Sequence, residues 1–144
     1  MDMNKYLEVA KICKEYYPSN IYEHAKKVEE YVILDSRYAL LSVEEQWLIR
    51  AVALAHDLLE DTNCTENILK EIDKDFSIYV DELTHKKNIS YYNYVKNIIE
   101  SNHYISIIVK TADIKDHLMR KKTLTPRLKE KYAKVIPLFL NKQE

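Results

Sequence analysis

The stretch WLIRAVALAHDLLEDT, residues 47–62, decides the predicted fold. The segment SVEE, residues 42–45, precedes it and forms a capping box, a pattern that marks the start of a helix. We expect this helix to run from Val43 to about Glu60. From Ala51 onward it is apolar on almost every side. A helix that is hydrophobic all round is buried, so this one is predicted to pass through the centre of the domain.

Helical periodicity dominates the rest of the chain. Pro18 ends a first amphipathic helix over residues 2–16, and Ser19 or Asn20 can cap the next one. The run YISIIV, residues 104–109, has strand propensity but no convincing strand partner, so we expect a helix there as well. Further helices are expected over 65–72, 76–83, 90–100 and, after the cap at Thr125 and Pro126, to about residue 140. The predicted fold is a compact all-α bundle in a single domain, residues 1–144.

Composition excludes several classes of function. The chain has no glycine, and glycine-rich phosphate loops need that residue for close backbone approach to a phosphate. A formal net charge of -1 supplies no general basic field for duplex nucleic acid. No apolar run is long enough for a membrane span or a secretory signal, and Cys13 and Cys64 are expected to be free thiols. These features predict a cytoplasmic protein.

The charged end of the predicted central helix contains the residues that could bind a metal or react. His56, Asp57, Glu60 and Asp61 follow the apolar run at spacings of three and four residues, which places them around one helix end. A frayed helix end with solvated acids is the simpler interpretation of such a cluster. A His-Asp pair inside an apolar stretch favours a bound divalent cation instead, because buried acids repel one another unless a positive charge lies among them.

Two distant residues extend this pattern, namely His24 in an early helix and Asp113 after a long apolar run. The order of these residues resembles the HD superfamily of metal-dependent phosphohydrolases, and most of all the alarmone (p)ppGpp hydrolase domains of the RelA/SpoT type and small stand-alone HD proteins. The segment HDLLEDT, residues 56–62, is similar to their HDxxEDT motif. The segments VDELTHKK, residues 80–87, and KTAD, residues 110–113, are similar to their VDxxTK and KLAD motifs.

The resemblance implies an HD-type helical bundle and a set of site residues. The matching metal ligands are His24, His56, Asp57 and Asp113, and they would hold one divalent ion, expected to be Mn²⁺, with Fe²⁺ or Zn²⁺ as alternatives. Glu60 and Asp61 match the catalytic acidic pair. The side chains expected to neutralise substrate phosphates are Lys86, Lys87, Lys110 and His117.

The expected substrate is a small nucleotide, with release of pyrophosphate from the 3′ position of a guanine nucleotide as the first hypothesis. The chain departs from the alarmone hydrolases where they have a basic, glycine-containing loop, since residues 16–22 read YYPSNIY. It also has His117 where they have Asn. A nucleotidase or phosphodiesterase, and a non-catalytic nucleotide-binding module, are therefore alternatives. Tyr91 and Tyr94 are expected to stack on a base or to pack in the core, and the sequence predicts no oligomeric state.

Overall fold

The computed structural model describes residues 1–142, with side chains to residue 140, and within that range it is helical and contains no strand. The all-α prediction is confirmed. In chain order the elements are α1 (Met3–Tyr16), α2 (Ser19–Leu34), η1 (Tyr38–Leu40), α3 (Val43–Ala55), α4 (Leu58–Asp61), α5 (Glu66–Ile72), α6 (Lys74–Glu82), α7 (Tyr91–Glu100), α8 (Tyr104–Met119), α9 (Pro126–Ala133) and α10 (Ile136–Lys142).

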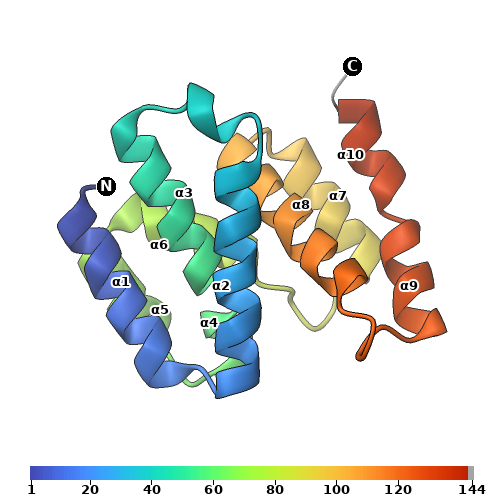
Figure 1. The fold of residues 1–144 in the computed structure, drawn as a ribbon, viewed down its shortest axis with the longest axis horizontal. Coiled ribbons are helices and arrows are strands. Elements are labelled where there is room, and N and C mark those ends of the chain that lie inside the picture. Colours follow the sequence, from blue (N-terminus) through green and yellow to red (C-terminus); the bar gives the residue numbers. More distant parts are fainter. Residues whose placement is uncertain (143–144) are drawn as a thin grey trace.

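Helix α3 is central, as its sequence predicts. It packs against α1, α2, α6 and α8, and its last two turns, residues 49–55, are buried except for Arg50. Figure 1 shows α2 crossing the molecule between α3 on one side and α8 on the other. Helix α2 therefore contacts both elements that carry the other candidate metal ligands.

The prediction that Ser19 or Asn20 caps the second helix is wrong, because α2 already begins at Ser19, with Pro18 in the N-cap position and no side-chain cap. Three other predicted caps are confirmed. Ser42 and Glu45 form the capping box of α3, the Ser90 side chain caps α7, and the Thr125 hydroxyl accepts a hydrogen bond from the Leu128 N–H with Pro126 at the first helical position. The apolar run 104–109 is helical and forms the buried first part of α8. It is buried because α8 packs against α2, α3 and α6.

The prediction of one continuous helix from Val43 to Glu60 is wrong. Helix α3 ends at Ala55, and Asp57 leaves the helical conformation with φ −102° and ψ 2° before the short helix α4 begins. The reason is the buried hydroxyl of Tyr17, which donates a hydrogen bond to the Leu54 carbonyl at 2.7 Å and accepts one from the Asp57 N–H at 3.2 Å. One side chain from outside the helix thus satisfies two backbone groups at the break.

The last predicted helix is also divided, into α9 and α10. Pro137 explains the break, because its ring removes a backbone N–H and clashes with the carbonyl four residues earlier, at Ala133. Helix α9 ends at that residue. The turn redirects α10 so that it packs against α7.

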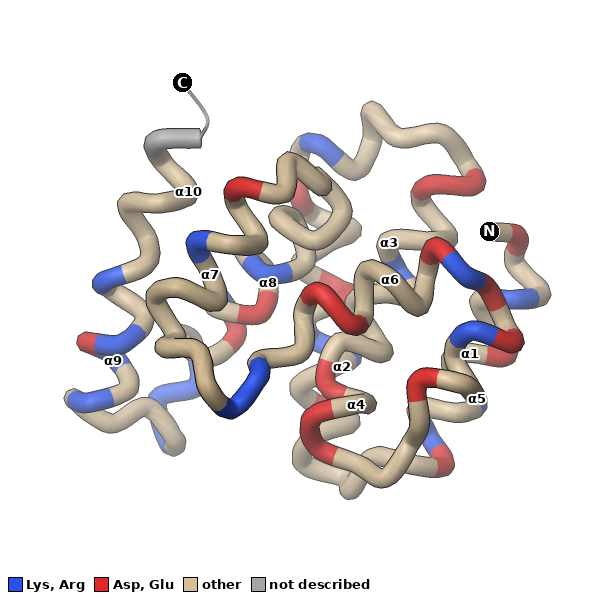
Figure 2. Tube along the Cα trace, turned by 180° about the vertical axis from the view of Figure 1, so that it is seen from behind, with Lys and Arg blue, Asp and Glu red and all other residues tan. Residues whose placement is uncertain are grey.

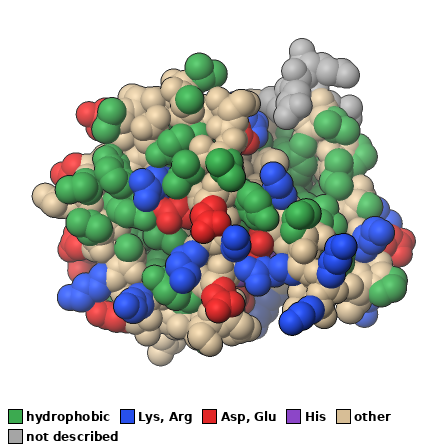
Figure 3. Space-filling view, in the orientation of Figure 1, with side chains coloured by type: hydrophobic (Ala, Val, Ile, Leu, Met, Phe, Trp, Pro, Cys, Tyr) green, Lys and Arg blue, Asp and Glu red, His purple; other side chains and the backbone are tan. Residues whose placement is uncertain are grey.

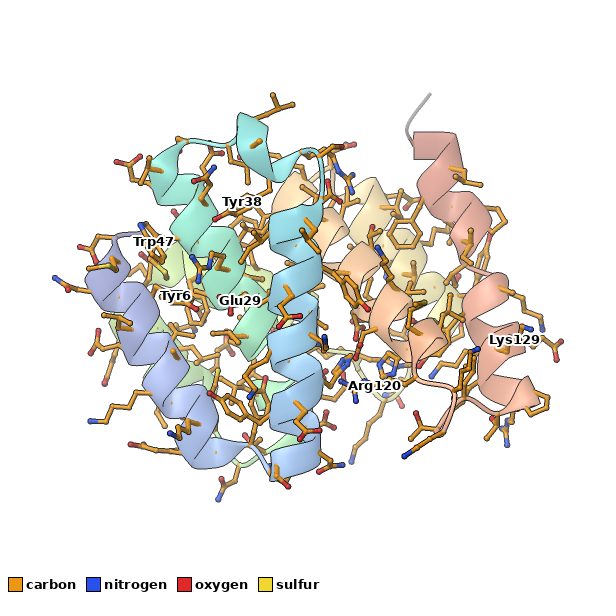
Figure 4. All side chains as sticks on the ribbon, viewed as in Figure 1. Tyr6, Glu29, Tyr38, Trp47, Arg120 and Lys129 are labelled. Atoms are coloured by element: carbon orange, nitrogen blue, oxygen red, sulfur yellow. The ribbon has the colours of Figure 1, made fainter. Side chains whose placement is uncertain are left out.

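A polar network ties the first three long helices together on one side of the molecule. Arg50 of α3 donates to the Glu29 carboxylate of α2 at 3.0 Å, and the Tyr6 hydroxyl of α1 donates to the same carboxylate. The Arg50 guanidinium also lies over the Trp47 ring, 4.9 Å from its centroid. Figure 4 shows Tyr6, Glu29 and Trp47 lying between these helices.

Cys13 and Cys64 are both buried and free, as expected. Among residues 1–142, no helix combines the length and the apolarity that a bilayer span requires.

Candidate metal centre

Three helical segments bring the four predicted ligands together. His24 comes from α2, His56 and Asp57 from the break between α3 and α4, and Asp113 from the middle of α8. His24, His56 and Asp113 are 7%, 2% and 4% exposed. Figures 1 and 2 both show α4 beside the first half of α2.

The distances between the candidate ligand atoms match a site for one ion. The Oδ1 atom of Asp113 lies 2.8 Å from His24 Nε2 and 3.3 Å from His56 Nε2. The Oδ2 atom of Asp57 lies 3.1 Å from His56 Nε2 and 3.7 Å from His24 Nε2. Ligand atoms at about 2.1 Å from one ion, and at right angles to one another, are about 3 Å apart. The predicted ligands therefore converge within the reach of a single cation.

Hydrogen bonds orient both imidazoles with Nε2 toward the cluster. His24 Nδ1 is 2.6 Å from the Asp116 carboxylate, and His56 Nδ1 is 2.7 Å from the Ala53 carbonyl. Since a carbonyl only accepts, Nδ1 of His56 carries the proton and donates. Such partners fix the tautomer of a metal-binding histidine and present its other nitrogen to the ion.

One buried nitrogen atom of the cluster is placed to bind a cation. His56 Nε2 is fully buried, and among the described residues it has no hydrogen-bond partner despite the two carboxylate oxygens beside it. A buried polar atom without a partner is costly. A cation between this nitrogen and the oxygens of Asp57 and Asp113 would satisfy it, so the residues fit a bound divalent ion.

Attraction between opposite charges in the cluster offsets the free-energy cost of burying its charged side chains. Burial lowers the pKa of His56, but the charges of Asp57 and Asp113 outweigh it and hold the pKa well above its ordinary value. Burial likewise raises the pKa of Asp113, yet Lys110 and His56 hold that pKa well below its usual range. Opposite charges packed in this way offset one another, which keeps Asp113 ionised as a ligand must be.

The structure adds Asp116, which the sequence analysis did not identify. It is 3% exposed on α8, contacts His24 through the hydrogen bond described above and accepts a hydrogen bond from Arg120 Nε at 2.5 Å. Arg120 lies where α2 and α8 approach one another (Figure 4). The signal was its position three residues after Asp113 on an apolar helix, a spacing that puts both acids on one face.

The two predicted catalytic acids lie at the solvent side of the cluster. Glu60 and Asp61 are exposed on α4, and with Asp57 they offer oxygens that all lie within 4.8 Å of one another. Burial and the charges of Asp57 and Glu60 raise the pKa of Asp61 to about 6. Glu60 Oε1 also accepts a hydrogen bond from the His85 backbone N–H at 2.8 Å, so the loop after α6 holds it in place.

A pocket of about 230 Å³ opens over the cluster. Two of the predicted phosphate-binding residues, Lys110 and His117, line it. Neither Lys86 nor Lys87 does, although both belong to the described part of the chain, and Lys86 instead pairs with Asp81 at 2.8 Å. The complete lining is Asp57, Glu60, Asp61, His85, Tyr91, Tyr94, Lys110, Asp113, His117, Lys131 and Tyr132.

His117 and Lys110 both contact Asp113 directly, in addition to lining the pocket. His117 Nε2 is 3.2 Å from Asp113 Oδ1, and the ring of His117 stacks on Tyr132. It forms a possible ligand triad with His24 and Asp113. Lys110 Nζ donates to Asp113 Oδ2 at 2.7 Å and lies 4.8 Å from the centroid of the Tyr94 ring. Both side chains therefore organise Asp113 as well as facing the pocket.

Tyr91 and Tyr94 lie at the boundary between the core and the pocket. Tyr94 is buried, its hydroxyl donates to the Leu83 carbonyl, and its ring stacks on His85 with a centroid distance of 4.7 Å. Both rings also line the pocket. Their packing therefore holds both tyrosine rings at the edge of the site.

No protein-family model matches the chain, and no curated protein is significantly similar to it.

Proposed function

We propose that this chain is a metal-dependent phosphohydrolase of the HD type that acts on a small nucleotide. The convergence of His24, His56, Asp57 and Asp113 around the unpartnered Nε2 of His56 carries the proposal. Mixed imidazole and carboxylate ligands suit Mn²⁺, Fe²⁺ or Zn²⁺, and the motif resemblance favours Mn²⁺.

A divalent ion, when bound, polarises phosphoryl oxygens and makes water a better nucleophile near neutral pH. The exposed acids of α4 supply the proton transfers at the mouth of the pocket. Glu60, held by the His85 N–H, orients the attacking water and accepts its proton. Asp61, with its pKa raised to about 6, passes a proton to the oxygen that leaves phosphorus. Water thus forms a new bond to phosphorus while the bond from phosphorus to the leaving oxygen breaks.

The substrate we infer first is a guanine nucleotide with a 3′ diphosphate, which would be cleaved to pyrophosphate and the 3′-hydroxyl nucleotide. Lys110 and Lys131, together with the rings of Tyr91 and Tyr132, give the pocket the cations and apolar rings that a nucleotide requires. A nucleotidase or phosphodiesterase on another nucleotide uses the same residues, and a non-catalytic binding module keeps the pocket without turnover.

A product screen separates these activities. The purified protein is incubated with Mn²⁺ and a panel of nucleotides that includes guanosine 3′,5′-bis(diphosphate), and phosphate and pyrophosphate are measured separately. Pyrophosphate release supports the first activity. Inorganic phosphate or a linear nucleotide supports the second, and tight stoichiometric binding without turnover supports the binding module.

The Glu60→Gln variant tests the assignment of the acids. It should retain Mn²⁺ and lose roughly 100-fold or more in turnover, the scale of acid–base catalysis. Glu66→Gln, an exposed acid on α5 away from the pocket, is the matched control and should turn over at the wild-type rate. Full activity in Glu60→Gln would contradict the role given to Glu60.

A further inference from the structure

His117 places a third imidazole nitrogen beside the predicted metal ligands. Its Nε2 atom lies 3.2 Å from Asp113 Oδ1. The same oxygen lies 2.8 Å from His24 Nε2 and 3.3 Å from His56 Nε2. Three imidazole nitrogens, from α2, the α3–α4 break and α8, therefore face one carboxylate oxygen.

The position of His117 follows from helical spacing and is fixed by packing. His117 comes four residues after Asp113, one turn further along the same face of α8. Its ring lies 4.4 Å from the His24 ring and stacks on the Tyr132 ring of α9, with a centroid distance of 5.2 Å and an angle of 10° between the planes. Tyr132 is buried. These contacts hold the imidazole in place with Nε2 beside the cluster, as a ligand requires.

The possible ligand atoms describe one ion and not two. They form two groups, in each of which the atoms lie within 4.8 Å of one another. The two groups are His24, Asp113 and His117, and His24, His56 and Asp57. Because Asp116 contacts Nδ1 of His24, Nε2 is the nitrogen of His24 that can bind an ion, and one imidazole nitrogen has a single lone pair. The two groups share that nitrogen, so both belong to one centre.

Charge also favours a neutral fifth ligand. Asp57 and Asp113 together balance the charge of a divalent cation, and a neutral imidazole adds a lone pair without adding charge. Lys110 also contacts Asp113, but its ammonium group offers no lone pair. Lys and Arg side chains gather on the surface around Arg120 as well (Figures 3 and 4), and they offer none either. Among the side chains that contact Asp113, His117 is therefore suited to complete the coordination of the ion.

We propose that His117 is a fifth ligand of the divalent ion, so that three nitrogens and two oxygens bind it. This inference rests on the metal centre of the proposed function, and it gives His117 a different role from the phosphate contact predicted from the sequence. A sixth coordination position stays open, as a catalytic site requires. Imidazole suits Fe²⁺ and Zn²⁺, whereas Mn²⁺ prefers oxygen ligands, so a third imidazole shifts the preference of the site toward Fe²⁺ and Zn²⁺.

Nuclear magnetic resonance of the histidine side chains tests the proposal directly. The chain has five histidines, and the ¹⁵N-labelled protein is titrated with diamagnetic Zn²⁺. The Nε2 resonances of His24, His56 and His117 should shift to metal-bound values. Those of His85 and His103 should keep the values of the metal-free protein. Shifts confined to His24 and His56 overturn the inference and leave the centre in place, and no shift in any histidine overturns both.

Calorimetry of the His117→Asn variant gives a second measurement. Its affinity for Zn²⁺ should fall about 100-fold or more, because loss of a ligand should cost at least as much as the 10–100-fold caused by loss of a ligand's hydrogen-bond partner. Its affinity for Mn²⁺ should fall less. His103→Asn, at an exposed histidine paired with Glu82, is the matched control and should bind both ions as the wild type does.

Equal Zn²⁺ affinity in His117→Asn and the wild type would overturn the proposal. Neither experiment contains a nucleotide. Metal-bound His117 in a protein that hydrolyses no nucleotide therefore supports the fifth ligand and refutes the proposed activity. Hydrolysis with His117 unbound refutes the fifth ligand alone.

Discussion

At the scale of single residues, the cluster depends on how its histidines are held. The nitrogen of His24 that faces away from Asp113 meets the buried carboxylate of Asp116, and that carboxylate is itself held by Arg120. A carboxylate in this position orients the imidazole and makes it a stronger ligand. Asp116 is therefore a positioning residue for the proposed centre.

Replacement of Asp116 by Asn should weaken Mn²⁺ binding by roughly 10–100-fold, the usual effect of removing the partner of a ligating histidine. Asn keeps the size of the side chain, so the helical circular dichroism spectrum should not change. Calorimetric titration with Mn²⁺ measures the effect. Asp75→Asn, on the first turn of α6, is the control. Unchanged affinity in Asp116→Asn would refute the positioning role.

A second residue-scale prediction concerns pH. Arg37 donates to both carboxylate oxygens of Asp35 at 2.9 and 2.8 Å, and these hydrogen bonds hold the pKa of Asp35 below its ordinary 3.8. A carboxyl group whose pKa is lowered by folding stabilises the fold above its unfolded pKa, and that stabilisation is lost as the pH falls through the folded pKa.

Asp35→Asn should thus lower the free energy of unfolding by about 0.5–1 kcal/mol at pH 7, the range of partly exposed ion pairs. The difference from the wild type should shrink as the pH falls below about 4. Urea unfolding at several pH values measures both quantities. Arg37→Gln should reproduce the same pH dependence, and a pH-independent difference would show that the ion pair is not its cause.

At the scale of elements, the break between α3 and α4 places His56 and Asp57 where they meet the other cluster residues. In a continuous helix the Leu54 carbonyl and the Asp57 N–H would bond within the helix. Here the Tyr17 hydroxyl, from the connection between α1 and α2, contacts both groups. The first helical hairpin therefore shapes the junction that carries His56 and Asp57.

Tyr17→Phe should destabilise the protein by about 1–3 kcal/mol, because two backbone groups lose their partner in a buried place. It should also weaken Mn²⁺ binding, since Asp57 follows the junction. Tyr16→Phe is a matched control, because the neighbouring Tyr16 is only half-buried and its hydroxyl makes no hydrogen bond within the described part of the chain. Thermal melts with and without Mn²⁺ distinguish the two variants. Equal melting temperatures of the two variants, with and without Mn²⁺, would contradict this role of Tyr17.

At the scale of the whole molecule, the cluster joins segments that lie far apart along the chain. It links α2, the α3–α4 junction and α8, whose contacting residues His24 and Asp113 are 89 positions apart. An ion that binds this arrangement, and not the unfolded chain, stabilises the entire fold.

Mn²⁺ at 100 times its dissociation constant should add about 2.7 kcal/mol of stability. For a domain of this size the melting temperature should rise on the order of 10 °C. His56→Ala and Asp57→Asn should each abolish the rise, while His103→Ala, an exposed residue paired with Glu82, should retain it. Differential scanning fluorimetry measures the shift. A rise of equal size in His56→Ala would show that the ion binds elsewhere.

The sequence by itself determined the helical class, most helix boundaries and the identity of the four residues that converge. Periodicity, capping boxes and proline act within about four residues, so they can be recognised along the chain. The motif resemblance supplied the pairing of His24 and Asp113 with the His56-Asp57 pair, which local pattern alone does not contain.

Only the tertiary structure decided how the site is built around those residues. The break at His56 comes from Tyr17, and the orientation of His24 comes from Asp116, 92 positions away in the sequence. The same packing leaves Lys86 and Lys87 away from the pocket and brings Lys131 to it. These features depend on which faces of separate helices meet, and no short-range pattern encodes that choice.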